Sequence, residues 1–176
     1  MTKIPTLITD IRPALSADAR GICTIYNDYV ATTTITFEED VVPDSEMAGR
    51  ILEVTDAGLP WLVAVLEGRV VGYAYATKWR ARPAYRHSVE TTIYLDQEVF
   101  GHGVGENLYR RLLDELRAGG LHTAIAGIAQ PNPRSVALHE RLGFCKVAHF
   151  SEVGHKLGHW VDVAYWQIDL DGVKVY

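Results

Sequence analysis

The alternation of apolar and polar residues is clearest in the middle of the chain, where it predicts a series of strands. Two apolar runs extend from Trp61 to Leu66 and from Val70 to Trp79, and they are joined by Glu67-Gly68-Arg69. A short joint that contains glycine is typical of an antiparallel hairpin. The run from Ser88 to Leu95 predicts a further strand. The centre of the chain is therefore expected to form a sheet.

Helical spacing of apolar residues marks other segments. Between Glu106 and Ala118, leucines keep to one face of a helix that Gly119-Gly120 ends. We expect helices at about 16–31, 44–54, 106–118 and 132–143, a loop or short strand at 32–37, and further strands at about 7–12, 123–128, 146–153 and 160–170, the last two flanking a polar loop. A meander of strands followed by alternating strands and helices indicates an α+β fold with a mixed, mostly antiparallel sheet flanked by helices.

Length and composition restrict the class of protein. The 176 residues suit a single domain over the whole chain, and 48% hydrophobic with 22% charged residues is ordinary for a globular protein. A net charge of −5 argues against a nucleic-acid binder, whose phosphate contacts need a basic surface. No apolar run is long enough to span a membrane, and the N-terminus lacks the apolar stretch of a secretory signal. With Cys23 and Cys145 as the two scattered cysteines, we expect a reduced, cytoplasmic protein.

The glycine-rich turn from Gly101 to Gly105, which leads into the helix at 106–118, has the sharpest local chemistry. Its glycines allow main-chain N–H groups to approach a ligand, and the helix N-terminus adds unpaired donors and a partial positive charge. Together these groups suit a pyrophosphate. The turn is not a Walker loop, because no Lys-Ser/Thr follows it, and it lacks the Gly-x-Gly-x-x-Gly spacing of a dinucleotide site. Taken alone, it is equally compatible with a tight strand-to-helix connection.

A second motif further along the chain favours the ligand-binding interpretation. Asn132-Pro133-Arg134-Ser135 opens a helix that ends in Leu142-Gly143-Phe144, and this pair of motifs resembles the GNAT acetyltransferase superfamily. Segments that resemble its phosphinothricin and methionine sulfone (sulfoximine) N-acetyltransferases lie at 26–28, 61–64, 72–74, 89–94 and 158–162. The resemblance covers about Ile11 to Asp169. It implies the GNAT-type acyl-CoA N-acyltransferase fold, acetyl-CoA as cosubstrate and a homodimer.

Two positions depart from the superfamily pattern. GNAT turns usually begin with Gln or Arg where this chain has Phe100, so one side chain that faces a phosphate is absent. The main-chain donors remain, and we expect weaker or rearranged binding. Many members place a tyrosine that protonates the leaving thiolate where this chain has His139, as its closer relatives do.

The resemblance also implies which residues hold the coenzyme. The strand residues present main-chain groups along the pantetheine where the sheet splays, and one of their N–H groups polarises the acetyl carbonyl. The turn holds the pyrophosphate, and the next helix adds an asparagine. The residues are Ile93, Tyr94 and Leu95 on the strand, Gly101, His102, Gly103, Val104, Gly105 and Glu106 in the turn, and Asn132 on the helix.

Acetyl transfer to an amine needs a neutral amine, a polarised thioester and a proton for the leaving sulfur. Glu90 lies just before the coenzyme stretch, and its family position favours a general base that takes the ammonium proton directly or through water if burial raises its pKa. The alternative is a salt bridge to Arg80 or Arg82. His139 is expected to donate the proton to sulfur, to orient the substrate or Glu90, or to be structural.

The expected substrate residues follow from the same resemblance. The segment 79–82 lines the substrate site in the family, and a guanidinium suits a carboxylate or the oxidised sulfur or phosphorus of an amino-acid analogue. Solvated surface charge is the alternative for these arginines, and ordinary core is the alternative for the aromatic walls. The expected set is Phe37, Tyr75, Arg80, Ala81, Arg82, Glu90, Thr91, Thr92 and His139.

A metal site is not expected. His155, His159 and Asp162 have a spacing compatible with metal ligands, but the surrounding glycines favour a loop and acetyl transfer requires no metal. Trp160 and Trp166 are expected to pack within the strands or at a subunit interface.

These features predict an enzyme that transfers acetyl from acetyl-CoA to the α-amine of phosphinothricin, methionine sulfoximine or methionine sulfone, by direct attack in a ternary complex. One alternative is another amine, such as a peptide N-terminus or a polyamine, although Arg80 and Arg82 favour an anionic substrate. A further alternative is a CoA-binding module without turnover, which would need neither Glu90 nor His139. No nucleic-acid or membrane partner is expected.

Overall fold

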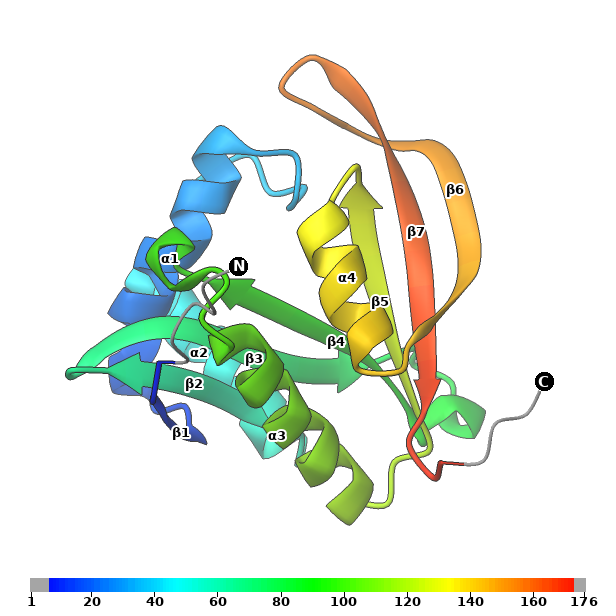
Figure 1. The fold of residues 1–176 in the computed structure, drawn as a ribbon, viewed down its shortest axis with the longest axis horizontal. Helices are drawn as coiled ribbons and strands as arrows, with labels where there is room; N and C mark the ends of the chain where they lie inside the picture. The colour runs from blue at the N-terminus through cyan, green and yellow to red at the C-terminus, as the bar shows by residue number, and fades with distance from the viewer. Residues whose placement is uncertain (1–6, 173–176) are drawn as a thin grey trace, which may run out of the picture.

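The computed structural model describes residues 7–172, and at its centre is a seven-stranded sheet with the strand order β1-β2-β3-β4-β5-β7-β6 (Figure 1). The strands are β1 (Asp10–Pro13), β2 (Trp61–Leu66), β3 (Arg69–Lys78), β4 (Ser88–Leu95), β5 (Thr123–Gln130), β6 (Cys145–Lys156) and β7 (His159–Asp169). The α-helices are α1 (Ala19–Thr32), α2 (Asp44–Asp56), α3 (Val104–Ala118) and α4 (Pro133–Arg141). The expected α+β class is confirmed, and residues 33–43 form a loop.

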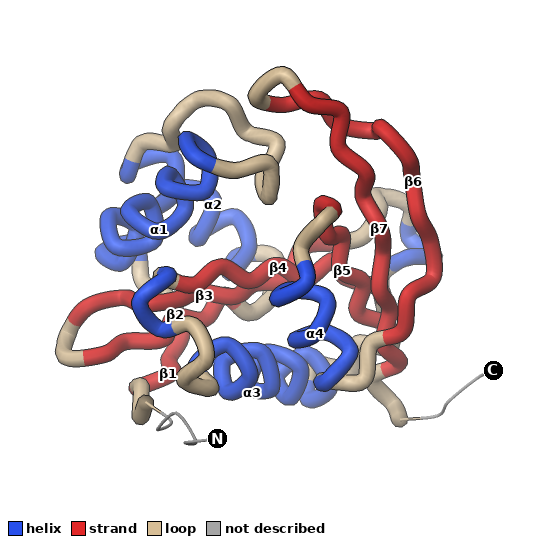
Figure 2. Tube along the Cα trace, turned by 45° about the horizontal axis from the view of Figure 1, so that its top comes forward, coloured by secondary structure: helices blue, strands red, loops and turns tan. Residues whose placement is uncertain are grey.

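The helices cover the two faces of the sheet in pairs (Figure 2). α1 and α2 pack where Trp61 and Tyr73 point, and Ile22 and Met47 are buried there. Because side chains alternate along a strand, Leu62 and Ala64 point to the other face, where the leucines of α3 are buried. The periodicity of each helix thus predicts the face that it buries. No helix within residues 7–172 is both long and apolar enough to cross a membrane.

The sheet opens between β4 and β5, which are its parallel neighbours. Their pairing runs from Ser88 opposite Thr123 to Glu90 opposite Ile125 and stops there. Beyond that point β4 stays paired with β3 up to Leu95, while β5 stays paired with β7. The two strands diverge in Figure 1. The splayed strands expected at the coenzyme stretch are therefore present, and main-chain groups of β4 beyond Glu90 are left without a β5 partner.

The prediction of a polar loop between the last two strands is wrong. β6 continues to Lys156 and β7 begins at His159, so that only a two-residue turn at Leu157-Gly158 joins them. The register shifts between Phe150 and Gly154, and Glu152 has a positive φ of 52°. A bulge of this kind breaks the two-residue alternation, and the sequence pattern therefore hides the second half of β6.

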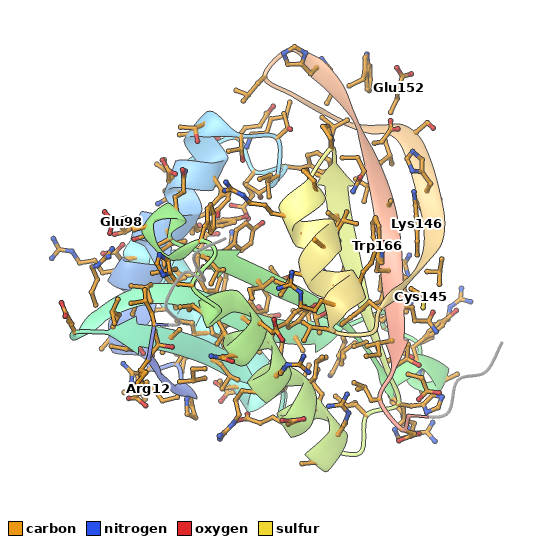
Figure 3. All side chains as sticks on the ribbon, in the orientation of Figure 1. Arg12, Glu98, Cys145, Lys146, Glu152 and Trp166 are labelled. Atoms are coloured by element: carbon orange, nitrogen blue, oxygen red, sulfur yellow. The ribbon has the colours of Figure 1, made fainter. Side chains whose placement is uncertain are left out.

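The two tryptophans of β7 have different surroundings. Trp166 is 2% exposed, its Nε1 donates to Glu140 at 3.3 Å, and the ammonium of Lys146 lies 5.5 Å from its ring centroid (Figure 3). Trp160, by contrast, is 64% exposed near the hairpin tip. Packing within the strands, one of the two expected alternatives, accounts for Trp166 only.

Candidate active site

Two cavities meet where β4 and β5 separate. The larger, of about 1180 Å³, is lined by the splayed end of β4, the glycine turn and the first turn of α4. The smaller, of about 790 Å³, is lined by the 33–43 loop, the end of β3, Glu90, and residues of β6 and β7. Both cavities include Ile35, Tyr94, Gly127 and Ala129 in their walls, so that molecules bound in the two would touch at that point.

The glycine turn holds the start of α3 at the larger cavity. Gly101 has φ +81° and Gly103 has φ +79°, a left-handed conformation that side chains rarely adopt. Gly103 is the N-cap of α3, and the first N–H groups of a helix have no partner within it. The turn therefore presents unpaired main-chain donors at a positive helix end, as a diphosphate requires.

Gly105 differs from the other two glycines of the turn. Its φ is not positive, and an added Cβ would lie 2.7 Å from Cδ1 of Leu95. We expected all three glycines to open the main chain to a ligand. For Gly105 the missing side chain instead allows α3 to pack closely on β4.

Most of the expected coenzyme residues line the larger cavity. These are Ile93, Tyr94, Leu95, Gly101, Gly103, Gly105, Glu106 and Asn132. His102 is not among the lining residues, and the side chain of Val104 is fully buried in the core. Thr91, Thr92 and His139, expected at the substrate, line this larger cavity and not the smaller one.

The first turn of α4 contributes a cation that the sequence analysis did not identify. Asn132 caps the helix, because its Oδ1 accepts from the N–H of Ser135 at 3.2 Å. Two residues further on, the guanidinium of Arg134 lies 4.6 Å from the ring centroid of Phe100, and both residues line the larger cavity. GNAT turns usually have Gln or Arg at the position of Phe100. Its replacement here was the available signal that a cation elsewhere could face the phosphates.

Glu90 lies in the wall of the smaller cavity, at the last position where β4 pairs with β5. Burial raises the pKa of Glu90, and the charge of Arg80 opposes this rise. Within residues 7–172 no ion pair joins Glu90 to Arg80 or Arg82, so the alternative of a structural salt bridge is wrong. Gly127 lies beside this carboxylate, since a Cβ there would lie 3.1 Å from Cε1 of Tyr165 and 3.4 Å from Oε1 of Glu90.

Aromatic side chains build the rest of the smaller cavity. Trp79 carries Arg80 on its ring at 4.6 Å from the centroid, and it meets the ring of Tyr165 edge to face at 5.8 Å. Tyr165 meets Phe150 in the same way, also at 5.8 Å. Of the residues expected at the substrate, Phe37, Arg80 and Glu90 line this cavity, and so does Trp79 of the same expected segment. Phe150 and Tyr165 were not predicted, because only the fold brings β6 and β7 to this cavity.

Three expected substrate residues line neither cavity. Tyr75 stacks on Trp61 with ring centroids 4.1 Å apart and belongs to the cluster under α1 and α2, which matches the alternative of ordinary core. Ala81 and Arg82 are exposed and line neither cavity. Neighbouring residues of a loop point in different directions, and the sequence gives no means to choose Arg80 over Arg82.

His139 is 3% exposed, and both of its ring nitrogens are engaged. Nδ1 lies 2.7 Å from the carbonyl oxygen of Ser135, which can only accept, so Nδ1 carries a proton. Nε2 lies 3.0 Å from the hydroxyl of Tyr109, which in turn lies 2.7 Å from Oγ1 of Thr91. Burial lowers the pKa of His139. Oγ1 of Thr91 also donates to the carbonyl oxygen of Ile125 at 3.2 Å, so the proton between Thr91 and Tyr109 comes from Tyr109. Both ring nitrogens of His139 therefore have partners within the protein.

The residues with metal-ligand spacing do not come together. His155 and His159 lie in strands and not in the expected loop, and His155 packs against Trp160 at 4.8 Å between ring centroids. Asp162 accepts from the N–H of Glu152 at 2.8 Å and lies 2.7 Å from Nε2 of His149. Its oxygens are therefore already used within the β6–β7 pair.

Comparisons with known proteins agree with this architecture. A family model described as an acetyltransferase (GNAT) domain matches residues 11–165. The phosphinothricin N-acetyltransferase of Streptomyces viridochromogenes is 40% identical over 162 residues, which cover 92% of this chain and 88% of that protein. The L-methionine sulfoximine/L-methionine sulfone acetyltransferase of Pseudomonas paraeruginosa is 38% identical over 93% of this chain and 96% of its own length.

Solved structures give the same result. The phosphinothricin acetyltransferase of Sinorhizobium meliloti, crystallised in complex with AcCoA, has a TM-score of 0.90 and 39% identity, with 97% of this chain and 93% of that chain covered. The resemblance inferred from the two motifs is thus confirmed over most of the chain. The chain belongs to the GNAT acetyltransferase family.

Proposed function

We propose that this acetyl-CoA-dependent N-acetyltransferase acts on the α-amine of a small amino-acid analogue such as phosphinothricin, methionine sulfoximine or methionine sulfone. The observation that carries the proposal is Glu90, a carboxylate with a raised pKa in the substrate cavity, close to the point where it meets a second cavity. Arg80 adds a cation for a carboxylate or for the oxygens of oxidised sulfur or phosphorus. The names of the relatives support this substrate class.

The larger cavity fits acetyl-CoA. The diphosphate would be held by the N–H groups of the turn from Gly101 to Glu106, and the pantetheine would run along the unpaired main chain of Ile93 to Leu95. The cosubstrate supplies the acetyl group as a thioester. Strands of the same sheet line both cavities, and we propose that residues 1–176 act as one GNAT domain.

Glu90 would take the proton of the substrate ammonium, directly or through water, so that the neutral amine attacks the acetyl carbonyl in a ternary complex. No covalent enzyme intermediate is required. A main-chain N–H in the Ile93–Leu95 segment would polarise that carbonyl. For His139 we propose an orienting function, because both of its ring nitrogens already have partners, Ser135 and Tyr109. We therefore do not assign to His139 the donation of a proton to the leaving sulfur.

A thiol-release assay with acetyl-CoA and a panel of amines tests the proposal. We expect turnover with the three amino-acid analogues and less with polyamines, because a single guanidinium and aromatic walls suit an anionic head with an apolar stem. Preference for peptide N-termini or polyamines would assign a different amine. CoA binding without thiol release for any amine would show a binding module instead.

We propose in addition a cytoplasmic homodimer. Leu157 and Trp160 are exposed at the turn between β6 and β7. Neither lines the smaller cavity, unlike Val147, Phe150 and Val153, and β6 is an edge strand of the sheet. Exposed apolar side chains beside a sheet edge are typical of protein interfaces. Cys145 is an exposed free thiol, which fits a reducing compartment. Light scattering at micromolar concentration would show a monomer if the dimer proposal is wrong.

A further inference from the structure

The loop at residues 33–43 forms one wall of the substrate cavity. Ile35, Thr36 and Phe37 line that cavity, and Ile35 also lies where the two cavities meet. Surface loops are usually among the more mobile parts of a protein. This loop lies between α1 and α2 on one side and the β6–β7 hairpin on the other, and it is attached to both (Figures 1 and 2).

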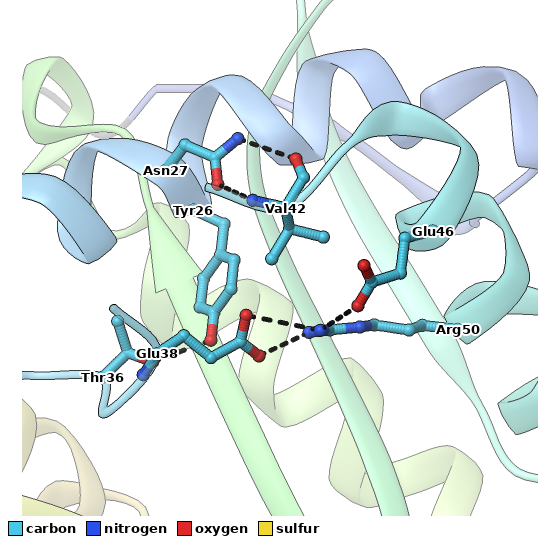
Figure 4. A network of polar contacts seen from close by, with 7 residues as sticks. All are labelled: Tyr26, Asn27, Thr36, Glu38, Val42, Glu46 and Arg50. Atoms are coloured by element: carbon cyan, nitrogen blue, oxygen red, sulfur yellow. Dashed lines mark hydrogen bonds and ion pairs between the residues drawn. The ribbon is translucent and has the colours of Figure 1, made fainter. Parts of the chain in front are cut away.

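Side chains of α1 and α2 hold the middle and the end of the loop (Figure 4). The amide of Asn27 bonds twice to the main chain of Val42: its Nδ2 donates to the carbonyl at 3.0 Å and its Oδ1 accepts from the N–H at 2.8 Å. Arg50 donates to the two carboxylate oxygens of Glu38 at 2.7 and 3.3 Å. These bonds attach the part of the loop that lies beyond the cavity wall.

The cavity wall itself is held from two opposite elements at Thr36. Its Oγ1 shares a hydrogen bond of 2.7 Å with the hydroxyl of Tyr26 on α1. Its carbonyl accepts from Nζ of Lys156, the last residue of β6, at 2.9 Å. Lys156 is 2% exposed, and within residues 7–172 no carboxylate lies within ion-pair distance of it. A buried ammonium needs hydrogen-bond partners, so the bond to Thr36 links the loop to the end of β6.

Gly154 gives β6 a second contact with the same wall. A Cβ built on Gly154 would lie 2.4 Å from Cζ of Phe37, and its three nearest atoms all belong to the Phe37 ring. The φ of Gly154 is not positive, so alanine meets no backbone strain there. The ring of Phe37 therefore occupies the space where any other residue would place its side chain.

We propose that β6 sets the position of this wall through Gly154 and Lys156, and that these two are specificity-determining positioning residues for the amine. The inference rests on the proposed function, because it takes the smaller cavity as the amine site. Neither residue lines that cavity, and both act through the residues that do. Displacing Phe37 changes the width of the cavity that receives the side chain of the amine and leaves the coenzyme cavity as it is.

The experiment is a mutant cycle on the full chain. Gly154→Ala should raise the KM for the amine about tenfold and change the KM for acetyl-CoA less than twofold. In a Phe37→Ala background, Gly154→Ala should have almost no further effect on the KM for the amine, because the aromatic ring that the added Cβ would displace is absent. Gly49→Ala is the matched control, since Gly49 is exposed on α2 with no atom within 4 Å of an added Cβ.

Lys156→Met tests the second contact. It keeps the bulk of the side chain but removes the donor to Thr36, and it should raise the KM for the amine and speed amide hydrogen exchange in residues 33–43. Gly154→Ala should also speed this exchange, and Gly49→Ala should not. The exchange measurement needs no turnover, so it separates this inference from the proposed function. Unchanged amine KM and unchanged exchange in both variants, or an equal effect of Gly154→Ala with and without Phe37, would overturn the inference.

Discussion

The two cavities are built in different ways, although they share part of their walls. The larger cavity, proposed for the coenzyme, is lined mainly by two stretches, 91–106 and 132–141, with residues of β5 between them. The smaller cavity, proposed for the substrate, collects residues from segments far apart in the chain, namely 35–37, 79–80, 90–94, 125–129, 147–153 and 163–167. The larger cavity thus depends more on local sequence, and the smaller one more on the assembled fold.

This difference separates what the fold provides from what the individual sequence chooses. A splayed parallel pair and a helix N-terminus present donors whatever the neighbouring side chains are. In the proposed function the amine meets Glu90, Arg80 and aromatic rings, and single substitutions there are expected to change the substrate. We therefore expect substitutions in the substrate cavity to change rate and substrate preference, and those in the turn to change coenzyme affinity.

Glu90→Gln should have the largest effect. Removing a general base lowers kcat by roughly 10²–10⁴-fold. The base works when ionised, so kcat/KM rises with pH through the pKa of Glu90, and burial places that rise above the range of an ordinary glutamate. The variant should lose this acid limb and keep its affinity for acetyl-CoA. Initial rates across pH measure both effects, with Glu53→Gln as an exposed control. An unchanged profile would remove Glu90 from the base function.

Gly103→Ala tests the coenzyme side. Left-handed backbone costs a non-glycine residue about 1–2 kcal/mol, and relaxation of that strain would misplace the donors of the turn. The KM for acetyl-CoA should rise roughly tenfold, with the KM for the amine unchanged. Gly58→Ala is matched in strain, because Gly58 has φ +74° and no atom within 4 Å of an added Cβ. Equal kinetics in the two variants would mean that the turn does not hold the coenzyme.

The backbone of the glycine turn is the part of the larger cavity most accessible to sequence reasoning, because its signals are local. Two of the three glycines of the turn have positive φ. The splay of β4 and β5 was expected from the resemblance alone. Other residues have directions that depend on packing: Val104 points into the core, and Gly105, although it lines the cavity, also makes room for Leu95. Such contacts are between elements, and no spacing within the turn reveals them.

Arg80→Ala should have the next largest effect, and it tests whether Arg80 binds the anionic group of the substrate. Loss of a charged hydrogen bond of about 1.5–3 kcal/mol should raise the KM for amines that carry a carboxylate by at least tenfold. The charge of Arg80 lowers the pKa of Glu90, so its removal should also move the acid limb to higher pH. Arg82→Ala is the natural control, since Arg82 is exposed and lines neither cavity. Equal effects in the two variants would place the anion site elsewhere.

The substrate side is harder to predict for a physical reason. Phe37 and Arg80 were identified through resemblance, but the same resemblance gave Tyr75, which stacks on Trp61. Phe150 and Tyr165 come from strands that pair beyond a bulge, where the alternation of side chains is lost. Only the assembled sheet shows which rings share the cavity.

Arg134→Ala should have the smallest effect, and it asks whether this side chain contributes to binding of the coenzyme in the larger cavity. Arg134 is exposed, and an ion pair of an exposed guanidinium is worth about 0.2–1 kcal/mol, which corresponds to at most a few-fold rise in KM for acetyl-CoA. Acetyl-pantetheine, which lacks the phosphates, should show no such rise. Combining Arg134→Ala with Phe100→Gln should restore part of the affinity, because the amide supplies a polar group where the ring stood. An equal loss with acetyl-pantetheine would assign Arg134 to packing and leave the diphosphate to the main chain alone.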